Sequence, residues 1–185
     1  MRGKCSGGRV GRDGAAFTVV ELLVVMAIII VLAGLVLATS SYVHNKGARS
    51  RAEAEIAAIS AGLENYKADN GVYPSAPSLD PRATGDPNQQ SYKDASLLLY
   101  KAISGDPAGN RLVIATSYFG FKPNQLAPSD TSQPVTYIKD PFGNSYGYST
   151  IFSTNPTKGY NPTFDLWSTA GSASDTGGPG WIKNW

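Results

Sequence analysis

The first strong pattern along the chain is a long run of aliphatic residues near its N-terminus. From Leu22 to Val43 there is no Asp, Glu, Lys or Arg. As an α-helix rising about 1.5 Å per residue, these 22 residues would span about 33 Å. A membrane hydrocarbon core is about 30 Å thick, so the run predicts one helix that crosses a membrane.

Helical periodicity continues after the charge-free run ends. Apolar residues recur at spacings of 4, 3, 4 and 3 and therefore share one helix face: Ala52, Ile56, Ile59, Leu63 and Tyr66. Asn70 and Gly71 supply a left-handed cap and Pro74 forbids continuation, which predicts a single helix of about 50 residues. The apolar stripe is too short for a coiled coil, so it should pack against the rest of its own domain.

The chain beyond Pro74 is rich in Gly, Pro, Ser, Thr and Tyr. Residues 75–91 have the composition of a loop. Residues 94–105 predict a short helix, with Asp94 or Ser96 near its start and Gly105 as its stop.

Strand patterns dominate the C-terminal half. Three segments have strand character: 111–121 ("RLVIATSYFGF"), 134–140 ("PVTYIKD") and 163–169 ("TFDLWST"). Pro141 and Gly143 predict a turn, so residues 135–152 should form a hairpin. A small antiparallel sheet of three or four strands that covers the helix stripe would give an α+β fold.

Charge is distributed unevenly. The first 14 residues hold four cations, Arg2, Lys4, Arg9 and Arg12, against the single acid Asp13. A basic flank predicts that this end stays in the cytoplasm while the C-terminal bulk lies outside. The net charge of +2, without any Lys-rich or Arg-rich block, argues against a nucleic-acid partner.

The residue types needed for catalysis are scarce. Cys5 is the one cysteine, so no disulfide can form within the chain. His44 is the one histidine, and it follows the apolar run directly. No phosphate loop, zinc spacing or G-x-S-x-G motif is present, so the sequence predicts a structural protein rather than an enzyme.

Glu21 is the exception in the apolar stretch. A charged side chain costs roughly 2.5–3.5 kcal/mol at the centre of a membrane helix and less near its end. A secretory signal peptide would have a shorter apolar run with a small-residue cleavage site after it, and a plain membrane anchor would leave Glu21 unexplained. The carboxylate could also simply lie among the lipid headgroups.

The segment "FTVVELLVVMAIIIVLAGLVLA" resembles the N-termini of type IV pilins and type II secretion pseudopilins. The resemblance implies a leader over residues 1–16, cleavage between Ala16 and Phe17 by a prepilin peptidase, and methylation of the new Phe17 amine. Gly usually precedes the Phe in this family, and here Ala16 stands in its place. Glu21 becomes the fifth residue of the mature chain.

The resemblance also gives Glu21 a role. In a filament of stacked helices, the N-terminal ammonium of a neighbouring subunit could lie beside this carboxylate. An opposite charge would favour the ionised form and offset the desolvation of both groups. A subunit out of register would leave both charges uncompensated, so Glu21 and Phe17 are predicted to set the assembly register.

Four stretches that follow the apolar run are similar to the major pseudopilins of type II secretion: "ENYKADNGVYP", "DPFGNSYGY", "FDLWS" and "IKNW". Those subunits hold Ca²⁺ before an Asn-Trp ending. The equivalent stretch here offers Asp175 and Ser172, with Ser168 and Asn184 as further oxygen donors. Calcium prefers six to eight oxygen ligands, several of them charged. The segment is therefore either a calcium site or a plain Gly-rich surface loop.

The implied protein is a subunit of the type II secretion pseudopilus with an α+β, pilin-like fold, in which a long N-terminal helix packs on a small antiparallel sheet. Its parts would be the leader 1–16, a transmembrane assembly helix 17–43, an amphipathic half 44–72 and a periplasmic globular domain 73–185. It would cross the inner membrane once and polymerise to drive protein export.

The implied partners are other copies of the chain, minor pseudopilins, the prepilin peptidase and an inner-membrane assembly platform. Energy would come from a separate cytoplasmic ATPase. Two alternatives stay open. One is a type IV pilus subunit for adhesion, motility or DNA uptake, and the other is a membrane-anchored binding module that never polymerises.

Overall fold

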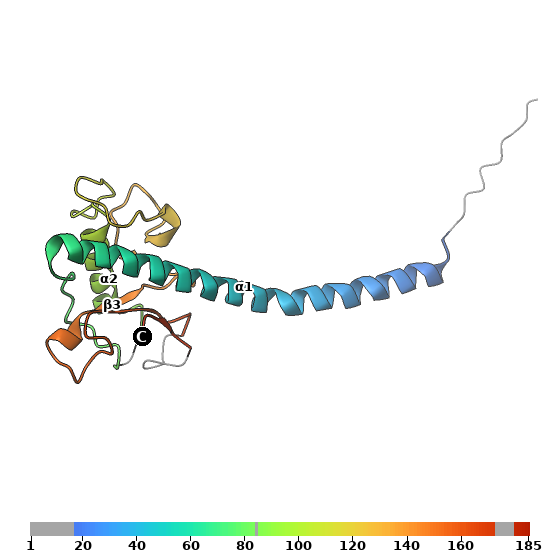
Figure 1. Ribbon diagram of the computed structural model, residues 1–185. Helices are drawn as coiled ribbons and strands as arrows, with labels where there is room; N and C mark the ends of the chain where they lie inside the picture. Colours follow the sequence, from blue (N-terminus) through green and yellow to red (C-terminus); the bar gives the residue numbers. More distant parts are fainter. Residues whose placement is uncertain (1–16, 84, 173–179) are drawn as a thin grey trace, which may run out of the picture. The chain divides into compact units, whose positions relative to one another are not determined.

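The computed structural model describes residues 17–83, 85–172 and 180–185, and it describes no side chain of residues 37–42. Two compact units divide the chain, Met1–Val43 and His44–Trp185. Helix α1 (Val19–Asn70) begins in the first unit and ends in the second (Figure 1). Every buried hydrophobic residue of the described chain belongs to the second unit.

Helix α1 ends where the sequence predicts. Gly71 has a φ of +78°, and its N–H donates to the Lys67 carbonyl at 2.7 Å. The side-chain amide of Asn70 donates to the Tyr66 carbonyl at 2.8 Å. The first bond satisfies a carbonyl group that the helix end would otherwise leave without a donor, and the second ties the Asn70 side chain back onto the last turn. The predicted left-handed cap is therefore confirmed.

The apolar stripe of α1 lies in the core of the second unit. Ala52, Ile59 and Leu63 are fully buried, and Ile56 is 4% exposed. Tyr66 packs against the same cluster from its edge, where its ring meets Tyr118 edge-on. Burying an Ile or Leu side chain contributes about 1.5–3 kcal/mol, so the stripe fastens this part of α1 to its own domain.

Helix α2 (Gln90–Ile103) starts four residues earlier than predicted, and neither Asp94 nor Ser96 caps it. The reason is Tyr92, which is 1% exposed and extends the buried face formed by Ala95, Leu99 and Ile103. The Gln90 amide also donates to the Asp94 carboxylate at 2.8 Å, one helical turn later. The predicted stop is confirmed, because Gly105 has a φ of +78° directly after the Ser104 cap.

The described strands form two small antiparallel sheets. One pairs β1 (Leu126–Ala127) with β2 (Tyr137–Ile138). The other has the order β3-β4-β5, from β3 (Gly147–Ser149), β4 (Asp165–Ser168) and β5 (Ile182–Lys183). Two 3₁₀ turns, η1 (Pro123–Gln125) and η2 (Ile151–Ser153), complete the described elements. The fold is α+β and pilin-like, as predicted.

The hairpin predicted over residues 135–152 is only partly present. The turn forms, since the Asp140 N–H donates to the Asn144 carbonyl at 2.8 Å. A single antiparallel bridge, Lys139 to Ser145, follows it. Beyond that bridge the two arms diverge into different sheets, because β2 pairs with β1 and β3 pairs with β4.

The strand predicted over residues 111–121 does not form. Its backbone N–H groups are used by the end of α2: Ile114 and Ala115 donate to the Gly105 carbonyl, and Tyr118 and Phe119 donate to the Ile103 carbonyl, at 2.8–3.0 Å. A helix end leaves carbonyl groups without intrahelical donors. Here the following segment supplies the donors, so it becomes a fixed loop instead of a strand.

A buried carboxylate organises the start of that loop. Asp106 is fully buried and accepts four hydrogen bonds, from the Tyr100 hydroxyl and from the N–H groups of Gly109, Asn110 and Arg111. Burial alone would raise the pKa of Asp106, but these hydrogen bonds outweigh it and hold the pKa below its ordinary value. Asp106 therefore stabilises the fold as an anion.

We expect Asp106→Asn to destabilise the second unit by about 1–3 kcal/mol at pH 7, because the amide places N–H groups among donors that need an acceptor. A carboxyl with a lowered folded pKa stabilises the fold above its unfolded pKa, about 3.9. That contribution is lost as the pH falls through the folded value. The difference between wild type and variant in thermal unfolding should therefore be full at pH 7 and shrink below about pH 4.

The exposed Asp94→Asn is the matched control and should show no such difference. Asp140 and Asp165 are both buried, and burial raises the pKa of each, so they add an opposite pH dependence. They are present in wild type and variant alike and cancel in the comparison. A constant difference from pH 3 to pH 7 would contradict an anionic role for Asp106.

Candidate functional site: the apolar segment and its cap

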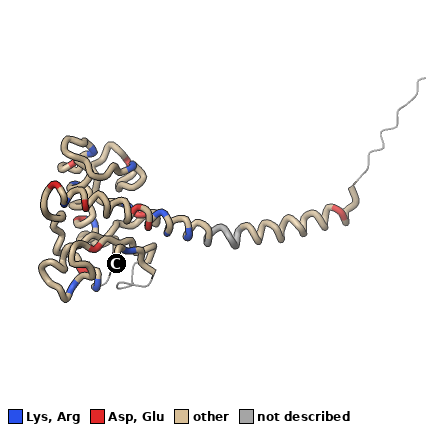
Figure 2. The backbone as a smooth tube through the Cα atoms, in the orientation of Figure 1, with Lys and Arg blue, Asp and Glu red and all other residues tan. Residues whose placement is uncertain are grey.

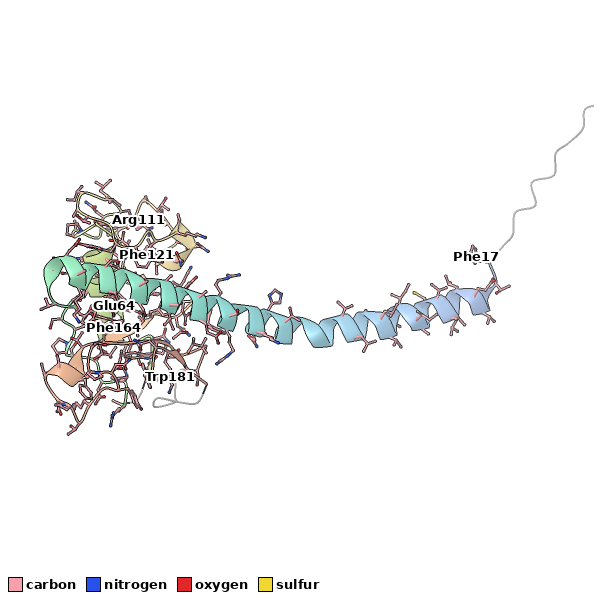
Figure 3. All side chains as sticks on the ribbon, in the orientation of Figure 1. Phe17, Glu64, Arg111, Phe121, Phe164 and Trp181 are labelled. Carbon is pink, nitrogen blue, oxygen red and sulfur yellow. The ribbon has the colours of Figure 1, made fainter. Side chains whose placement is uncertain are left out.

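The first part of the candidate site is an exposed apolar helix surface. Within Val19–Val36, which has a mean hydropathy of 3.1, none of the side chains is buried. Phe17, just before the helix, is 86% exposed (Figure 3). Length and composition suit a membrane span. A surface this apolar requires either lipid or the same surface of other molecules as its surroundings.

Glu21 lies in the first turn of this helix and closes its N-terminus. Figure 2 shows an acidic position at the helix start, followed by a long stretch without charge. The Glu21 carboxylate accepts hydrogen bonds from the Thr18 N–H at 2.8 Å and from the Thr18 hydroxyl at 2.9 Å. The Glu21 N–H in turn donates to the Thr18 hydroxyl at 3.2 Å. This reciprocal pairing is a capping box, and it satisfies N–H groups that have no partner inside the helix.

The capping box gives Glu21 a role that the sequence reading missed. Thr18 was available as a signal, because a Thr followed three residues later by a Glu before an apolar run is the sequence pattern of such a box. Both hydrogen bonds from Thr18 go to one oxygen of the Glu21 carboxylate, and both donors are neutral. The cap does not neutralise the negative charge, so it fixes where that charge points at the start of the helix.

The remaining predicted site residues are placed as follows. Ala16, like the leader 1–16, lies outside the described residues, so the cleavage site stays a prediction. Asp175 also lies outside them. The Ser172 N–H donates to the Thr169 carbonyl at 3.0 Å in the turn after β4. The structure thus brings Phe17 and Glu21 to the same helix start, and of the two main predicted metal ligands, Asp175 and Ser172, it describes only Ser172.

The two further oxygen donors considered for calcium have protein partners. The Ser168 hydroxyl donates to the buried Asp140 carboxylate at 2.5 Å. The Asn184 side chain accepts from the Leu166 N–H and donates to the Phe164 carbonyl, and so joins β4 to the chain end. No group of three metal-binding side chains occurs among the described residues.

A polar cleft of about 350 Å³ lies between α1 and the turn after β2, with Arg51, Glu55, Lys139 and Asp140 in its lining. Glu55 accepts from the Tyr146 hydroxyl at 2.8 Å. Burial, reinforced by the Glu55 charge, raises the pKa of Tyr146, which keeps this hydroxyl a donor. The carboxylates of Glu55 and Asp140 therefore both accept hydrogen bonds from side chains of the fold, from Tyr146 and Ser168 respectively.

Comparison with known proteins places the chain among secretion proteins. It is 32% identical over 103 residues to type II secretion system core protein G of Aeromonas hydrophila, covering 54% of this chain and 71% of that protein. The protein of the same name from Pseudomonas aeruginosa is 33% identical over 103 residues, again covering 54% of this chain and 71% of that protein. That of Escherichia coli is 33% identical over 108 residues, with 53% and 69% covered.

The chain belongs to the family of type II secretion system core protein G. The family resemblance predicted from the N-terminal and C-terminal motifs is thereby confirmed. The relatives in this core protein G family are named as parts of a secretion system and not as enzymes. No family model and no solved structure matches the chain.

Proposed function

We propose that this chain is a structural subunit of the type II secretion pseudopilus and polymerises through the segment that starts at Phe17. The observation that carries the proposal is the apolar helix Val19–Val36, exposed along its whole length and closed at its start by Glu21. In the membrane, lipid would cover this surface. In the filament, the same segment of neighbouring subunits would replace the lipid.

The charge of Glu21 would then select the register of assembly. Cleavage after Ala16 would create a positive amine on Phe17, next to the capping box. A carboxylate already oriented by Thr18 could meet the Phe17 amine of a neighbour without further ordering. Any other register would bury two separated charges, which is strongly unfavourable in an apolar core.

The proposed topology follows from the same segment. The chain would cross the inner membrane once, with residues 1–16 in the cytoplasm and the domain that follows α1 in the periplasm. Growth of the filament would push exported proteins through an outer-membrane channel. Minor pseudopilins, a prepilin peptidase and an inner-membrane assembly platform are the proposed partners, and a separate ATPase would supply the energy.

Mass spectrometry of the protein purified from membranes tests the processing step. We expect the mature chain to begin at Phe17 and to carry one methyl group on its α-amine. Ala16→Arg should block cleavage and leave the full-length chain, since the peptidase recognises a small residue there. An intact N-terminus in the wild-type protein would contradict the proposed role.

The two alternatives make different predictions for the same preparations. A type IV pilus subunit would be processed in the same way but would assemble with retraction machinery instead of a secretion channel. A membrane anchor that never polymerises would remain monomeric and active after Glu21 is replaced. Loss of secretion in a deletion strain, restored by the wild-type gene, separates the pseudopilus from both.

A further inference from the structure

A second apolar surface lies on the C-terminal unit, in the loop that replaces the predicted strand. Leu112, Val113 and Ile114 are 61%, 65% and 76% exposed. Together they form what we call the aliphatic knob. Three consecutive large aliphatic side chains facing water are unusual at the surface of a folded domain, where exposed apolar residues are normally scattered singly.

The loop holds the aliphatic knob rigidly. Before it, the Arg111 N–H donates to the buried Asp106 carboxylate at 2.7 Å, and the Arg111 guanidinium donates to the carbonyls of Gln133 and Pro128. At its end, the N–H groups of Ile114 and Ala115 donate to the Gly105 carbonyl. A surface fixed in advance loses little conformational entropy when it binds a partner.

The size of the knob limits what it can bind. Fully burying one aliphatic side chain removes on the order of 100 Å² of apolar surface from water, so three partly exposed ones offer on the order of 200 Å². A stable interface between free proteins buries about 800 Å² on each partner. The knob is too small to hold a separate partner, but it can add a contact between subunits that another interface already keeps together.

A receiving surface exists elsewhere on the same unit. A cleft of about 500 Å³ lies at the end of α1; Val72, Tyr73 and Pro162 supply its apolar lining, and Lys67 is among its polar lining residues. Val72 is 66% exposed. The Tyr73 ring packs on Phe164 at 5.0 Å, which anchors the cleft to the second sheet. In Figure 3, Arg111 next to the knob and Phe164 next to the cleft lie on different sides of α1.

We infer that the aliphatic knob of one subunit docks into the Val72–Pro162 cleft of a second copy of this chain; the inference rests on the proposed polymerisation. A knob and a cleft on different sides of one molecule cannot satisfy each other within that molecule. When the contact is not reciprocated between the same two copies it is head-to-tail, and its repetition produces an open filament where the rotation does not close into a ring. The contact would link C-terminal units, in addition to the packing of the apolar helices.

Cysteine cross-linking between differently marked copies tests this contact. The full chain is used with Cys5→Ser, and Val113→Cys and Val72→Cys are introduced into separate copies that are expressed together. After oxidation of membranes and filaments, we expect a covalent dimer in the mixture and none with either variant alone. Adding Ile114→Lys to the V113C copy should lower the dimer yield about tenfold or more, because it places a second cation in a cleft that Lys67 already lines.

Asn88→Cys, an exposed site outside both surfaces, replaces V72C as the matched control and should yield no dimer with V113C. Thermal unfolding should be unchanged by Ile114→Lys, because the Ile114 side chain is mostly exposed. Filaments that form normally while the V113C and V72C copies cross-link no more than the control would overturn the inference and leave the proposed function intact. Absence of filaments together with control-level cross-linking would overturn both. Equal dimer formation by V113C alone, or cross-linking of V113C to another protein instead, would also overturn the inference.

Discussion

Glu21→Val is expected to abolish filament formation while the protein still inserts into the membrane. Valine removes the one charge of the apolar segment, so partition into lipid becomes more favourable by roughly 2 kcal/mol or more. In the proposed filament, the same change would leave the Phe17 amine of a neighbouring subunit without a counter-charge. Truncating one partner of a buried charge pair costs about 3–5 kcal/mol, enough to lower assembly by roughly two to four orders of magnitude.

The capping box allows the charge of Glu21 to be separated from its hydrogen bonds. Glutamine can also fill the last position of a capping box, so Glu21→Gln should keep the bond from the Thr18 N–H and lose only the charge. Thr18→Val removes the capping hydroxyl and keeps the charge, at a cost of about 1 kcal/mol to the helix start. We therefore expect Glu21→Gln to fail in assembly and Thr18→Val to assemble with reduced yield.

Electron microscopy of sheared filaments and carbonate extraction of membranes provide the two measurements. Membrane extraction should be unchanged in all three variants, which makes it the control for insertion. Normal filaments from Glu21→Gln, with failure of Glu21→Val, would assign the role of Glu21 to capping alone. Normal filaments from both would refute charge-based registration.

The sequence alone predicted the parts of the fold that depend on local patterns. The spacing of Ala52, Ile56, Ile59 and Leu63 identified the buried face of α1, because helix geometry alone decides which residues share a face. The helix end predicted at Gly71 is confirmed, because the backbone there has a positive φ, which only a few residue types tolerate. Both features require no knowledge of distant residues.

The parts that were missed depend on contacts distant in sequence or on competition for hydrogen bonds. Residues 111–121 have high strand propensity, yet their N–H groups pair with Gly105 and Ile103 at the end of α2. The propensity of a segment does not reveal that a neighbouring helix end offers carbonyl acceptors. The start of α2 was misplaced for a similar reason, since the burial of Tyr92 against Trp167 of a remote strand extends the helix.

For the candidate site, the sequence singled out Phe17 and Glu21, whose roles in processing and assembly stay predictions, but it did not reveal the hydrogen-bond partner of the Glu21 carboxylate. Glu21 stood out because it is costly where it lies, whereas Thr18 is an ordinary residue at a helix start. Its importance comes from two hydrogen bonds to one carboxylate oxygen. The calcium prediction rests on Asp175, outside the described residues, and stays a prediction.

The packing of the second sheet depends on a glycine opposite a tryptophan. Gly147 in β3 is directly paired with Trp167 in β4. Trp167 is fully buried, and its indole N–H donates to the Tyr92 hydroxyl at 3.2 Å. Its ring lies parallel to Trp181 at 5.9 Å and meets Tyr92 edge-on at 5.6 Å. The ring is therefore held from several sides and lies directly over Gly147.

Gly147→Ala is expected to destabilise the C-terminal unit by at least about 2–3 kcal/mol. A Cβ at this position would overlap the Trp167 ring, including an approach of 2.7 Å to its Cδ2 atom. Trp167 cannot move aside without breaking its bond to Tyr92 and its stacking on Trp181. We expect the Tm to fall by roughly 5–12 °C. Circular dichroism in the near-ultraviolet should also change, because it reports the fixed environment of the tryptophans.

Gly120→Ala is the matched control, because a Cβ there meets no atom within 4 Å. Its Tm should stay within about 2 °C of wild type. Alanine normally stabilises a strand position relative to glycine by roughly 0.5–1 kcal/mol, so a loss at Gly147 must come from the overlap and not from the backbone. Equal unfolding temperatures for the two variants would mean that Trp167 does not lie on Gly147. The three C-terminal strands would then be held together by some other contact.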